Sequence, residues 1–515
     1  MTLPFPALLR SSAHRTASVL LLYLVLAASP QRAPAFAAPV DAGALAARLY
    51  ASGAPPRWLE HGQAPARLAL RLLGDAATHG LDPALYRTDE LAHQLDRAVS
   101  PDDKAAFERA LSTAMLQYLA DLHAGRTPSP YRQDQDALAG FDPVAELRQA
   151  AASGRLADAV DAAAPALPLY ARVKASLAQY RELAGRAPEW PALPAGAAAL
   201  RERLRLLGDL EGGVEEGDAG AAGSPALASA VRRFQERHGL VEDGRVGPAT
   251  LAALAVPPAQ RAAQLALTLE RLRWLPPLRG RVIAVNVPAY RLWAFDLGQA
   301  ASTPLEMRVI VGRAAGTPTP SFLGHMRAVE FNPYWNVPRS IALGEILPKL
   351  VHHPAYLRQN DMELVAANGQ VLATAGPQAV AALRTGTARV RQRPGAKNAL
   401  GNIKFAMPNP MNIYLHSTPS QELFQRGRRD LSHGCIRVEH PAALASFVLA
   451  DPDRWSEQQI AAAMRPGPPR TVSLATPVTV ILFYATAVTD RQGRVLFAND
   501  IYGRDRQLSA ALASR

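Results

Sequence analysis

The chain of 515 residues holds a single cysteine, Cys435, which directly follows Ser432, His433 and Gly434 and lies downstream of His416. Thiolate is the reactive form of cysteine, and an imidazole within hydrogen-bond reach is the usual means of generating it at neutral pH. A lone cysteine is more often a small buried hydrophobe. The two histidines and the glycine around this one instead predict a nucleophile site.

This arrangement resembles the signature of a known family. The order of His416, residues 417–431 and then Ser-His-Gly-Cys at 432–435 is similar to that of the L,D-transpeptidases with a YkuD-type catalytic domain, which cross-link peptidoglycan. The resemblance covers the chain from about Arg281 to the C-terminus and a module before it. Further segments resemble the long, periplasmic Gram-negative members, and these are 332–338, 398–401, 404–405 and 500–505.

The resemblance implies a role for each residue of the motif. Cys435 would form a thioester with a tetrapeptide stem, His416 would be the general base and acid, and the main-chain carbonyl of Ser417 would orient the His416 ring. Backbone N–H groups at His433, Gly434 and the cysteine would stabilise the oxyanion. From the residues alone, the two histidines could exchange roles.

Substrate-binding residues are predicted around the motif. Arg437 follows the cysteine by two positions, so in a strand both side chains lie on one side, and its guanidinium suits a stem carboxylate. An ordinary salt bridge is the alternative. Many family members have Asn at this position, whereas the long members often carry Arg. Ser432, Trp335 and Tyr414 are further candidates for contacts with the substrate, although aromatic residues are equally typical of a core.

The sequence predicts no metal site and no cofactor. Cys435, His433 and His416 lack the additional ligands that a zinc site needs, and 312–317 lacks the lysine spacing of a phosphate-binding loop.

Two other functions stay open. The same thioester could be resolved by water, in an L,D-carboxypeptidase or an enzyme that releases lipoprotein from the wall. The chain could also be a non-catalytic wall-binding protein.

Composition and the N-terminus bear on location and partners. Hydrophobic residues make up 49% and charged residues 19%, with a net charge of +12, and the length predicts two to four domains. No basic run with interleaved aromatics favours nucleic acid, and an anionic wall polymer or a membrane surface fits the basic charge equally well, so the charge alone does not identify the partner. Arg10 and Arg15 precede an apolar stretch at 19–28 and Ala-Phe-Ala at 35–37, which predicts a cleaved signal peptide over 1–37 and a periplasmic protein. No later stretch is long enough to span a membrane.

The predicted fold is multidomain α+β: a helical N-terminal scaffold, a three-helix wall-binding module, and a mainly-β catalytic domain with an α/loop capping insertion. The expected boundaries are 40–190 for the scaffold, 194–257 for the module with a loop at 211–224, 281–485 for the catalytic domain, about 340–397 for its insertion, and 486–515 for a C-terminal extension. The module resembles the peptidoglycan-binding modules of wall hydrolases, which implies contacts with glycan strands. The scattered histidines of the scaffold, among them His79, are expected at the surface or at helix ends and not as ligands. Strands are expected at 281–287, 290–296, 305–311, 326–331, 403–406, 412–415, 471–474 and 478–484.

Overall fold

A computed structural model of the chain describes residues 40–514 except 52, 54, 132–136, 188, 191–195, 211–223, 300–302 and 373–375. The predicted signal peptide and nearly all of the predicted 211–224 loop lie outside the described residues. Within the described ranges, no helix has both the length and the apolar character needed to cross a lipid bilayer.

The first region is helical, as predicted. Its helices are α1 (Ala42–Ala51), α2 (Ala64–Gly74), α3 (Thr88–Arg97), α4 (Pro101–Ala124), α5 (Pro143–Ser153) and α6 (Leu156–Ala163). The Ser100 hydroxyl and the Asp103 carboxylate form a capping box that starts α4, and leucines and alanines at helical spacing fill one core.

His79 lies at the end of a 3-10 helix (Asp75–His79), one of the two places expected for it, but it is not at the surface. Its side chain is buried, with Nδ1 3.0 Å from the Tyr170 hydroxyl and Nε2 2.7 Å from Lys174 Nζ. Burial and then the two nearby cations lower its pKa to about 3. The ring is therefore a neutral bridge between the first helices and α7 (Pro168–Arg186).

The predicted three-helix unit is present. It consists of α8 (Ala197–Leu206), α9 (Pro225–Arg237) and α10 (Pro248–Leu254), and α11 (Pro258–Arg273) follows it. Leu204, Val231 and Phe234 are in its small core, and a buried ion pair joins Arg237 to Asp209 with Nε 2.6 Å from the carboxylate. These contacts account for the compact fold of so short a unit.

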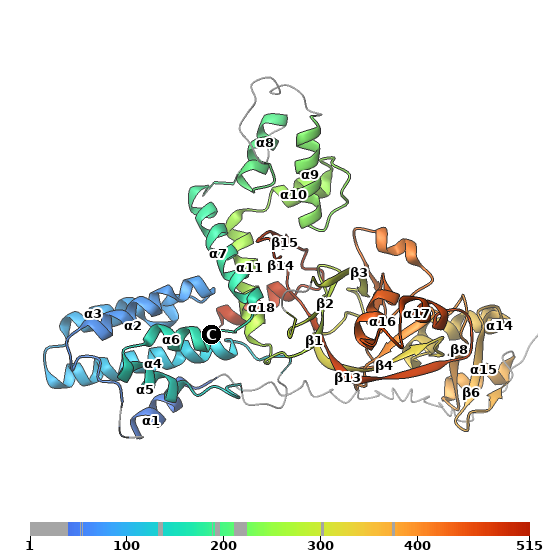
Figure 1. Cartoon of the computed structure of the whole chain (residues 1–515), viewed down its shortest axis with the longest axis horizontal. Coiled ribbons are helices and arrows are strands. Elements are labelled where there is room, and N and C mark those ends of the chain that lie inside the picture. The colour runs from blue at the N-terminus through green and yellow to red at the C-terminus, as the bar shows by residue number, and fades with distance from the viewer. Residues whose placement is uncertain are drawn as a thin grey trace, which may run out of the picture. The chain divides into compact units, whose positions relative to one another are not determined.

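The β-rich region is built on a nine-stranded sheet in the described part of the chain, in the order β11-β3-β12-β10-β9-β4-β13-β1-β2. Because β2 also pairs with β3, the sheet closes on itself as a barrel. Helices α16 (Pro441–Leu449) and α17 (Glu457–Ala463) share its core (Figure 1). The strands are β1 (Arg281–Asn286), β2 (Arg291–Asp296), β3 (Leu305–Gly312), β4 (Phe322–Phe331), β9 (Ile403–Ala406), β10 (Leu415–His416), β11 (Asp430–Ser432), β12 (Ile436–Val438) and β13 (Arg470–Phe483).

Most predicted strands are found, with two differences. The strand expected at 412–415 is reduced to β10, because Asn412 adopts a left-handed backbone conformation with φ 53°. The two strands expected at 471–474 and 478–484 are one strand, β13, whose pairing with β4 shifts register between Ser473 and Val478. Pro477 lies in this irregular stretch, where a residue without an N–H is tolerated.

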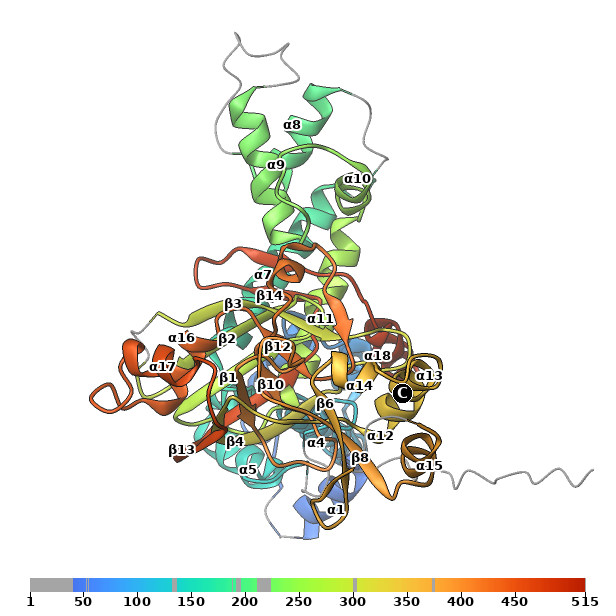
Figure 2. The ribbon, with the colours of Figure 1, turned by 90° about the vertical axis from the view of Figure 1, so that its right-hand side faces the viewer.

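The insertion has the expected helical segments, but it also contains strands that were not predicted. With β5, which directly precedes it, these strands form a four-stranded sheet in the order β5-β8-β6-β7 with a core of its own. Figure 2 shows β6 and β8 with α15. The strands of this sheet are β5 (Trp335–Asn336), β6 (Met362–Ala366), β7 (Val371–Leu372) and β8 (Ala388–Gln392), and the helical segments are α12 (Arg339–Ile341), a π-helical turn (Ala342–Ile346), α13 (Leu347–His352), α14 (Tyr356–Gln359) and α15 (Pro377–Thr385).

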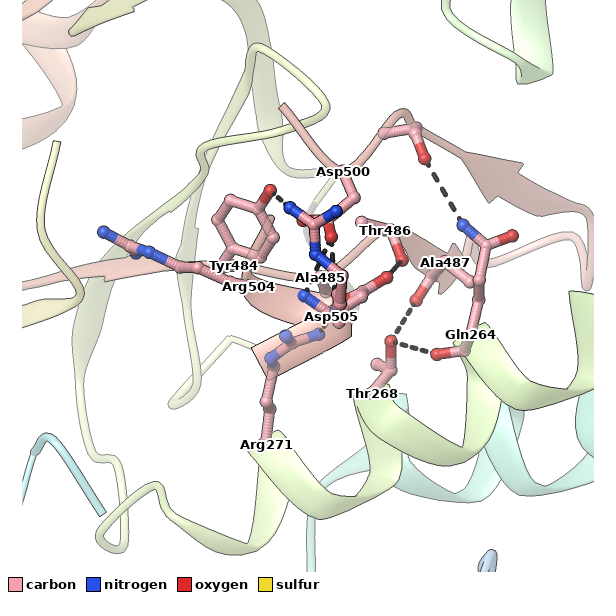
Figure 3. Close-up of polar contacts among 12 residues, drawn as sticks. Gln264, Thr268, Arg271, Tyr484, Ala485, Thr486, Ala487, Asp500, Arg504 and Asp505 are labelled. Atoms are coloured by element: carbon pink, nitrogen blue, oxygen red, sulfur yellow. Dashed lines mark hydrogen bonds and ion pairs between the residues drawn. The ribbon is translucent and has the colours of Figure 1, made fainter. Parts of the chain in front are cut away.

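The C-terminal segment forms β14 (Ala487–Thr489), β15 (Val495–Phe497) and α18 (Arg504–Ala513). It is joined to α11 by polar contacts (Figure 3): the Thr268 hydroxyl donates to the Ala487 carbonyl at 2.7 Å, and the Arg271 guanidinium lies 2.5 Å from the Asp505 carboxylate. The segment is thus part of the packed structure.

Candidate active site

Two short strands place the motif residues. β10 and β12 are parallel neighbours, with Leu415 opposite Ile436. Both of these side chains are fully buried in the barrel core. Because side chains alternate along a strand, the residues on either side of each point to the other face of the sheet. That face therefore carries His416 and Arg437, and Tyr414 and Cys435 directly precede the two strands.

His416 is almost fully buried and makes the contact that the resemblance implied. Its Nδ1 lies 2.6 Å from the main-chain oxygen of Ser417. With Nδ1 assigned as the donor, Nε2 is the nitrogen without a proton in the neutral ring. The main chain of Leu400 is a second hydrogen-bond partner of the ring. Burial, and then the charge of Arg437, lowers the pKa of the ring to about 3, so the imidazole is neutral at physiological pH.

Ser417 also fixes the loop beside the histidine. Its hydroxyl accepts from the Asn402 N–H at 2.9 Å and donates to the Leu400 carbonyl at 3.0 Å. Gly401 between them has φ 63°, and a Cβ there would lie 2.2 Å from the Ser417 hydroxyl oxygen. The 398–401 segment noted in the sequence is therefore a support for the loop that follows His416.

Cys435 is half-buried, and its thiol donates to the main-chain oxygen of Asn412 at 3.5 Å. Burial raises its pKa, while hydrogen bonds from the main-chain N–H and the phenol of Tyr414 act in the opposite direction. The Tyr414 and His416 rings are 5.7 Å apart between centroids. The thiol is thus hydrogen-bonded to the backbone, and its burial favours the protonated form.

Ser432 and Gly434 differ from their predicted roles. The buried Ser432 hydroxyl donates to the Cys435 main-chain oxygen at 2.6 Å and accepts from the Gly434 N–H at 3.1 Å. Neither the hydroxyl nor that N–H is left free for substrate or for an oxyanion. The N–H of Cys435 has no partner among the residues that the structure describes, and it remains the available donor at the nucleophile.

His433 points toward the insertion. Its Nε2 lies 2.5 Å from the carboxylate of Glu345, in the π-helical turn, and Arg313 lies 3.4 Å from the same carboxylate. The hydrogen bond from His433 is the main cause that lowers the pKa of Glu345. Neither Glu345 nor Arg313 was predicted, because no motif marks either residue.

The three remaining predicted residues lie around the nucleophile. Arg437 makes no ion pair with any described residue, and its buried Nε has no hydrogen-bond partner among them. Burial is the main cause that raises the pKa of Tyr414, and a hydrogen bond from Trp335 opposes the rise. Trp335 is the first residue of β5, which pairs with β8 of the insertion.

Comparisons with known proteins match three regions of the chain. Residues 280–480 match a family model described as "L,D-transpeptidase catalytic domain", 44–177 one described as "Scaffold domain", and 195–254 one described as "Putative peptidoglycan binding domain". A protein of Haemophilus influenzae named "Putative L,D-transpeptidase" is 34% identical over 248 residues, which are 48% of this chain and 49% of the relative. The chain thus spans about half the length of the curated relative that it matches.

Two solved structures are also similar. The L,D-transpeptidase of Stackebrandtia nassauensis is 14% identical, over 55% of this chain and 88% of that one, with a TM-score of 0.22. The L,D-transpeptidase fragment of Xylanimonas cellulosilytica is 17% identical, over 57% of this chain and 100% of that one, with a TM-score of 0.17. At these scores neither likeness establishes the fold. The family models and the Haemophilus relative do identify the regions: the chain carries a YkuD-type L,D-transpeptidase catalytic domain together with a peptidoglycan-binding domain.

Proposed function

We propose that the protein is a peptidoglycan L,D-transpeptidase that forms 3-3 cross-links through a Cys435 thioester, in cell wall biogenesis. The proposal is supported by the parallel pairing of β10, which ends at His416, with β12, which begins directly after Cys435, and by the bond between His416 Nδ1 and the Ser417 oxygen. A nucleophile, a base and a group that orients the base are what acyl transfer needs.

The proposed reaction has two halves. In the first, the sulfur of Cys435 attacks the amide carbonyl carbon between the third residue of a tetrapeptide stem and its terminal D-Ala, and the thiol proton passes to His416 Nε2. The C–N bond breaks, and D-Ala leaves as an amine with that proton. In the second, the amine of a neighbouring stem attacks the thioester and gives a proton to His416, which returns it to the departing sulfur.

The pKa values favour a neutral resting pair. Burial disfavours both the thiolate and the imidazolium, so the proton moves only as the carbonyl is attacked. The negative charge then moves to the carbonyl oxygen, and the N–H of Cys435 would donate a hydrogen bond to this oxygen. One such donor contributes on the order of 10²–10³ in rate.

Substrate recognition follows from the surrounding groups. A carboxylate of the stem would pair with Arg437, whose buried Nε lacks a partner among the described residues. Trp335 and Tyr414 would flank the peptide. The 195–254 module would hold the enzyme on glycan strands, and the predicted signal peptide would deliver it to the periplasm.

Incubation with purified disaccharide-tetrapeptide tests the proposal. A cross-linked dimer is the expected product with the wild-type protein, and none is expected with Cys435→Ala. A tripeptide without dimer would instead indicate a carboxypeptidase. An unchanged substrate, or full activity in the Cys435→Ala variant, would show that this site does not perform the reaction.

A carbapenem gives an independent measurement of the same nucleophile. Intact-protein mass spectrometry is expected to show one drug adduct on the wild-type chain and none on Cys435→Ala. Because the sequence has one cysteine, an adduct on the variant would place the reactive group elsewhere.

A further inference from the structure

A buried threonine joins the end of β3 to the turn that carries the nucleophile. Thr319 is fully buried, and its hydroxyl accepts from the Gly312 N–H at 2.8 Å and donates to the main-chain oxygen of Gly434 at 2.8 Å. That oxygen belongs to the peptide unit between Gly434 and Cys435. The same unit carries the N–H of Cys435.

The peptide unit cannot be held at its oxygen without setting the direction of its N–H. The unit is planar and trans, so its C=O and N–H point in opposite directions. A bond that draws the Gly434 oxygen toward Thr319 therefore aims the Cys435 N–H away from Thr319. This N–H is the donor without a partner among the described residues.

The neighbouring contacts restrict the turn further. The Ser432 hydroxyl accepts from the N–H of Gly434 at 3.1 Å, so Gly434 is hydrogen-bonded at both its N–H and its oxygen. The φ of Gly434 is 113°, a value open to glycine alone. On the facing strand, a Cβ at Gly312 would lie 3.0 Å from the Gly434 Cα and 2.1 Å from the Thr317 oxygen. The two backbones thus pack directly against each other.

The C-terminal segment supports Thr319 from the other side. The Tyr502 hydroxyl donates to the Gly312 oxygen at 2.5 Å and accepts from the Thr319 N–H at 3.2 Å. Arg504 donates to the Thr319 oxygen at 2.9 Å. Tyr502 is fixed in turn, because its own N–H donates to the Tyr484 hydroxyl at 3.0 Å. Figure 3 shows Tyr484 bonded to Asp500 with Arg504 beside it.

We propose that Thr319 is a positioning residue for the acyl-transfer reaction: its hydroxyl sets the orientation of the Gly434–Cys435 peptide so that the Cys435 N–H meets the developing oxyanion, and Tyr502 holds Thr319 in place. The proposal rests on the proposed function. It assigns a role in the reaction to a buried hydroxyl outside the motif and to a tyrosine of the tail.

Two substitutions at one position separate this role from packing. Thr319→Val keeps the side-chain shape and removes the hydroxyl, whereas Thr319→Ser keeps the hydroxyl and removes the methyl. We expect Thr319→Val to lower kcat by about tenfold to a hundredfold. An oxyanion donor contributes a factor on the order of 10²–10³ to the rate, and a misdirected donor loses part of this factor. KM should change by less than about twofold. Thr319→Ser should stay within about threefold of the wild-type kcat.

Iodoacetamide provides the matched control reaction, since its alkylation of Cys435 creates no oxyanion. The Thr319→Val variant should therefore be alkylated at the wild-type rate while its acylation by a carbapenem slows by the same factor as kcat. Equal losses in both reactions, or a Thr319→Val variant with wild-type kcat, would overturn the proposal. If the wild-type protein itself forms neither dimer nor adduct, the proposed function fails instead.

Tyr502→Phe tests the second contact and covers the case in which Thr319→Val does not fold. It removes one hydroxyl at the side of Thr319 remote from the nucleophile. We expect a smaller loss of acylation, about threefold to tenfold, again with unchanged alkylation. A wild-type acylation rate in this variant would remove Tyr502 from the proposal. If the Thr319→Ser variant were also inactive in acylation, the proposal as a whole would be refuted.

Discussion

Burial favours the uncharged forms of both Cys435 and His416. It raises the pKa of the Cys435 thiol and lowers that of the His416 ring to about 3. Since thiolate is the species that reacts with iodoacetamide, a raised thiol pKa means less thiolate at pH 7 than in an ordinary thiol. We therefore predict that the alkylation rate of Cys435 keeps rising with pH and reaches no plateau below about pH 8.5.

Stopped alkylation followed by mass spectrometry, with glutathione as the reference thiol, measures this pH profile. At pH 7 Cys435 should react more slowly than glutathione. A plateau near pH 6, with faster reaction than glutathione, would indicate a preformed thiolate–imidazolium pair and would contradict the neutral resting state.

Arg437 offers a second prediction at the residue scale. A charge-assisted hydrogen bond to a carboxylate contributes about 1.5–3 kcal/mol, so Arg437→Gln should lower kcat/KM for tetrapeptide stems by roughly tenfold to a hundredfold. Stems amidated at one carboxyl at a time identify the partner. The matching amide should lower the wild-type kcat/KM by a similar factor and have little further effect on Arg437→Gln. Additive losses for every amide would show that Arg437 binds no stem carboxylate.

Sequence reasoning reached the residues whose evidence is local. The Ser-His-Gly-Cys run is contiguous in the chain, and the family resemblance implied the contact between His416 and the neighbouring Ser417 carbonyl. Thr319 and Glu345 come to the same site through strand pairing and the insertion, and no short pattern encodes such contacts. Ser432 was assigned to the substrate because its position in the motif does not reveal that its hydroxyl is used within the turn.

At the scale of elements, pattern length decided what could be predicted. The long barrel strands show alternation, and they were placed to within a few residues. The strands β5 and β7 have two residues each, too few to show any period, so the insertion was expected to be helix and loop. The parallel pairing of β10 with β12 was likewise beyond the sequence, although it is what puts His416 beside the Cys435 turn.

The insertion is attached to the nucleophile turn by Glu345, which contacts His433 and Arg313. The pKa of Glu345 lies below its usual range, so the carboxylate stays ionised between pH 5 and 8. We predict that Glu345→Gln raises KM for the stem by about twofold to tenfold and leaves kcat nearly unchanged, because a partly exposed charged contact contributes on the order of 0.5–1.5 kcal/mol.

Glu363→Gln is the control for this prediction, since Glu363 pairs with Arg391 inside the sheet of the same insertion and does not contact the motif. It should leave KM close to that of the wild type. Equal KM values for the two variants would show that the Glu345 contact does not affect substrate binding.

At the scale of the whole molecule, a buried ion pair connects segments that are far apart in sequence. Arg271 on α11 lies 2.5 Å from Asp505 on α18, and the Thr486 hydroxyl donates to the same carboxylate (Figure 3). Both side chains are largely buried. Removing one partner of a buried ion pair leaves the other charge buried without a partner and typically lowers the free energy of unfolding by about 3–5 kcal/mol.

We therefore predict that Asp505→Ala lowers the thermal unfolding midpoint by roughly 6–20 °C, since 1 kcal/mol shifts the midpoint of a domain of 150–250 residues by about 2–4 °C. Glu60→Ala breaks the exposed Arg57–Glu60 pair and is the control, with an expected change below about 1 kcal/mol. The double variant Arg271→Met/Asp505→Leu, which replaces both charges with apolar groups, should recover most of the loss.

Because the same segment holds Tyr502 against Thr319, Asp505→Ala should also slow carbapenem acylation below the unfolding midpoint. A variant that unfolds at a lower temperature but keeps the wild-type acylation rate would show that α18 stabilises the fold without supporting the nucleophile turn.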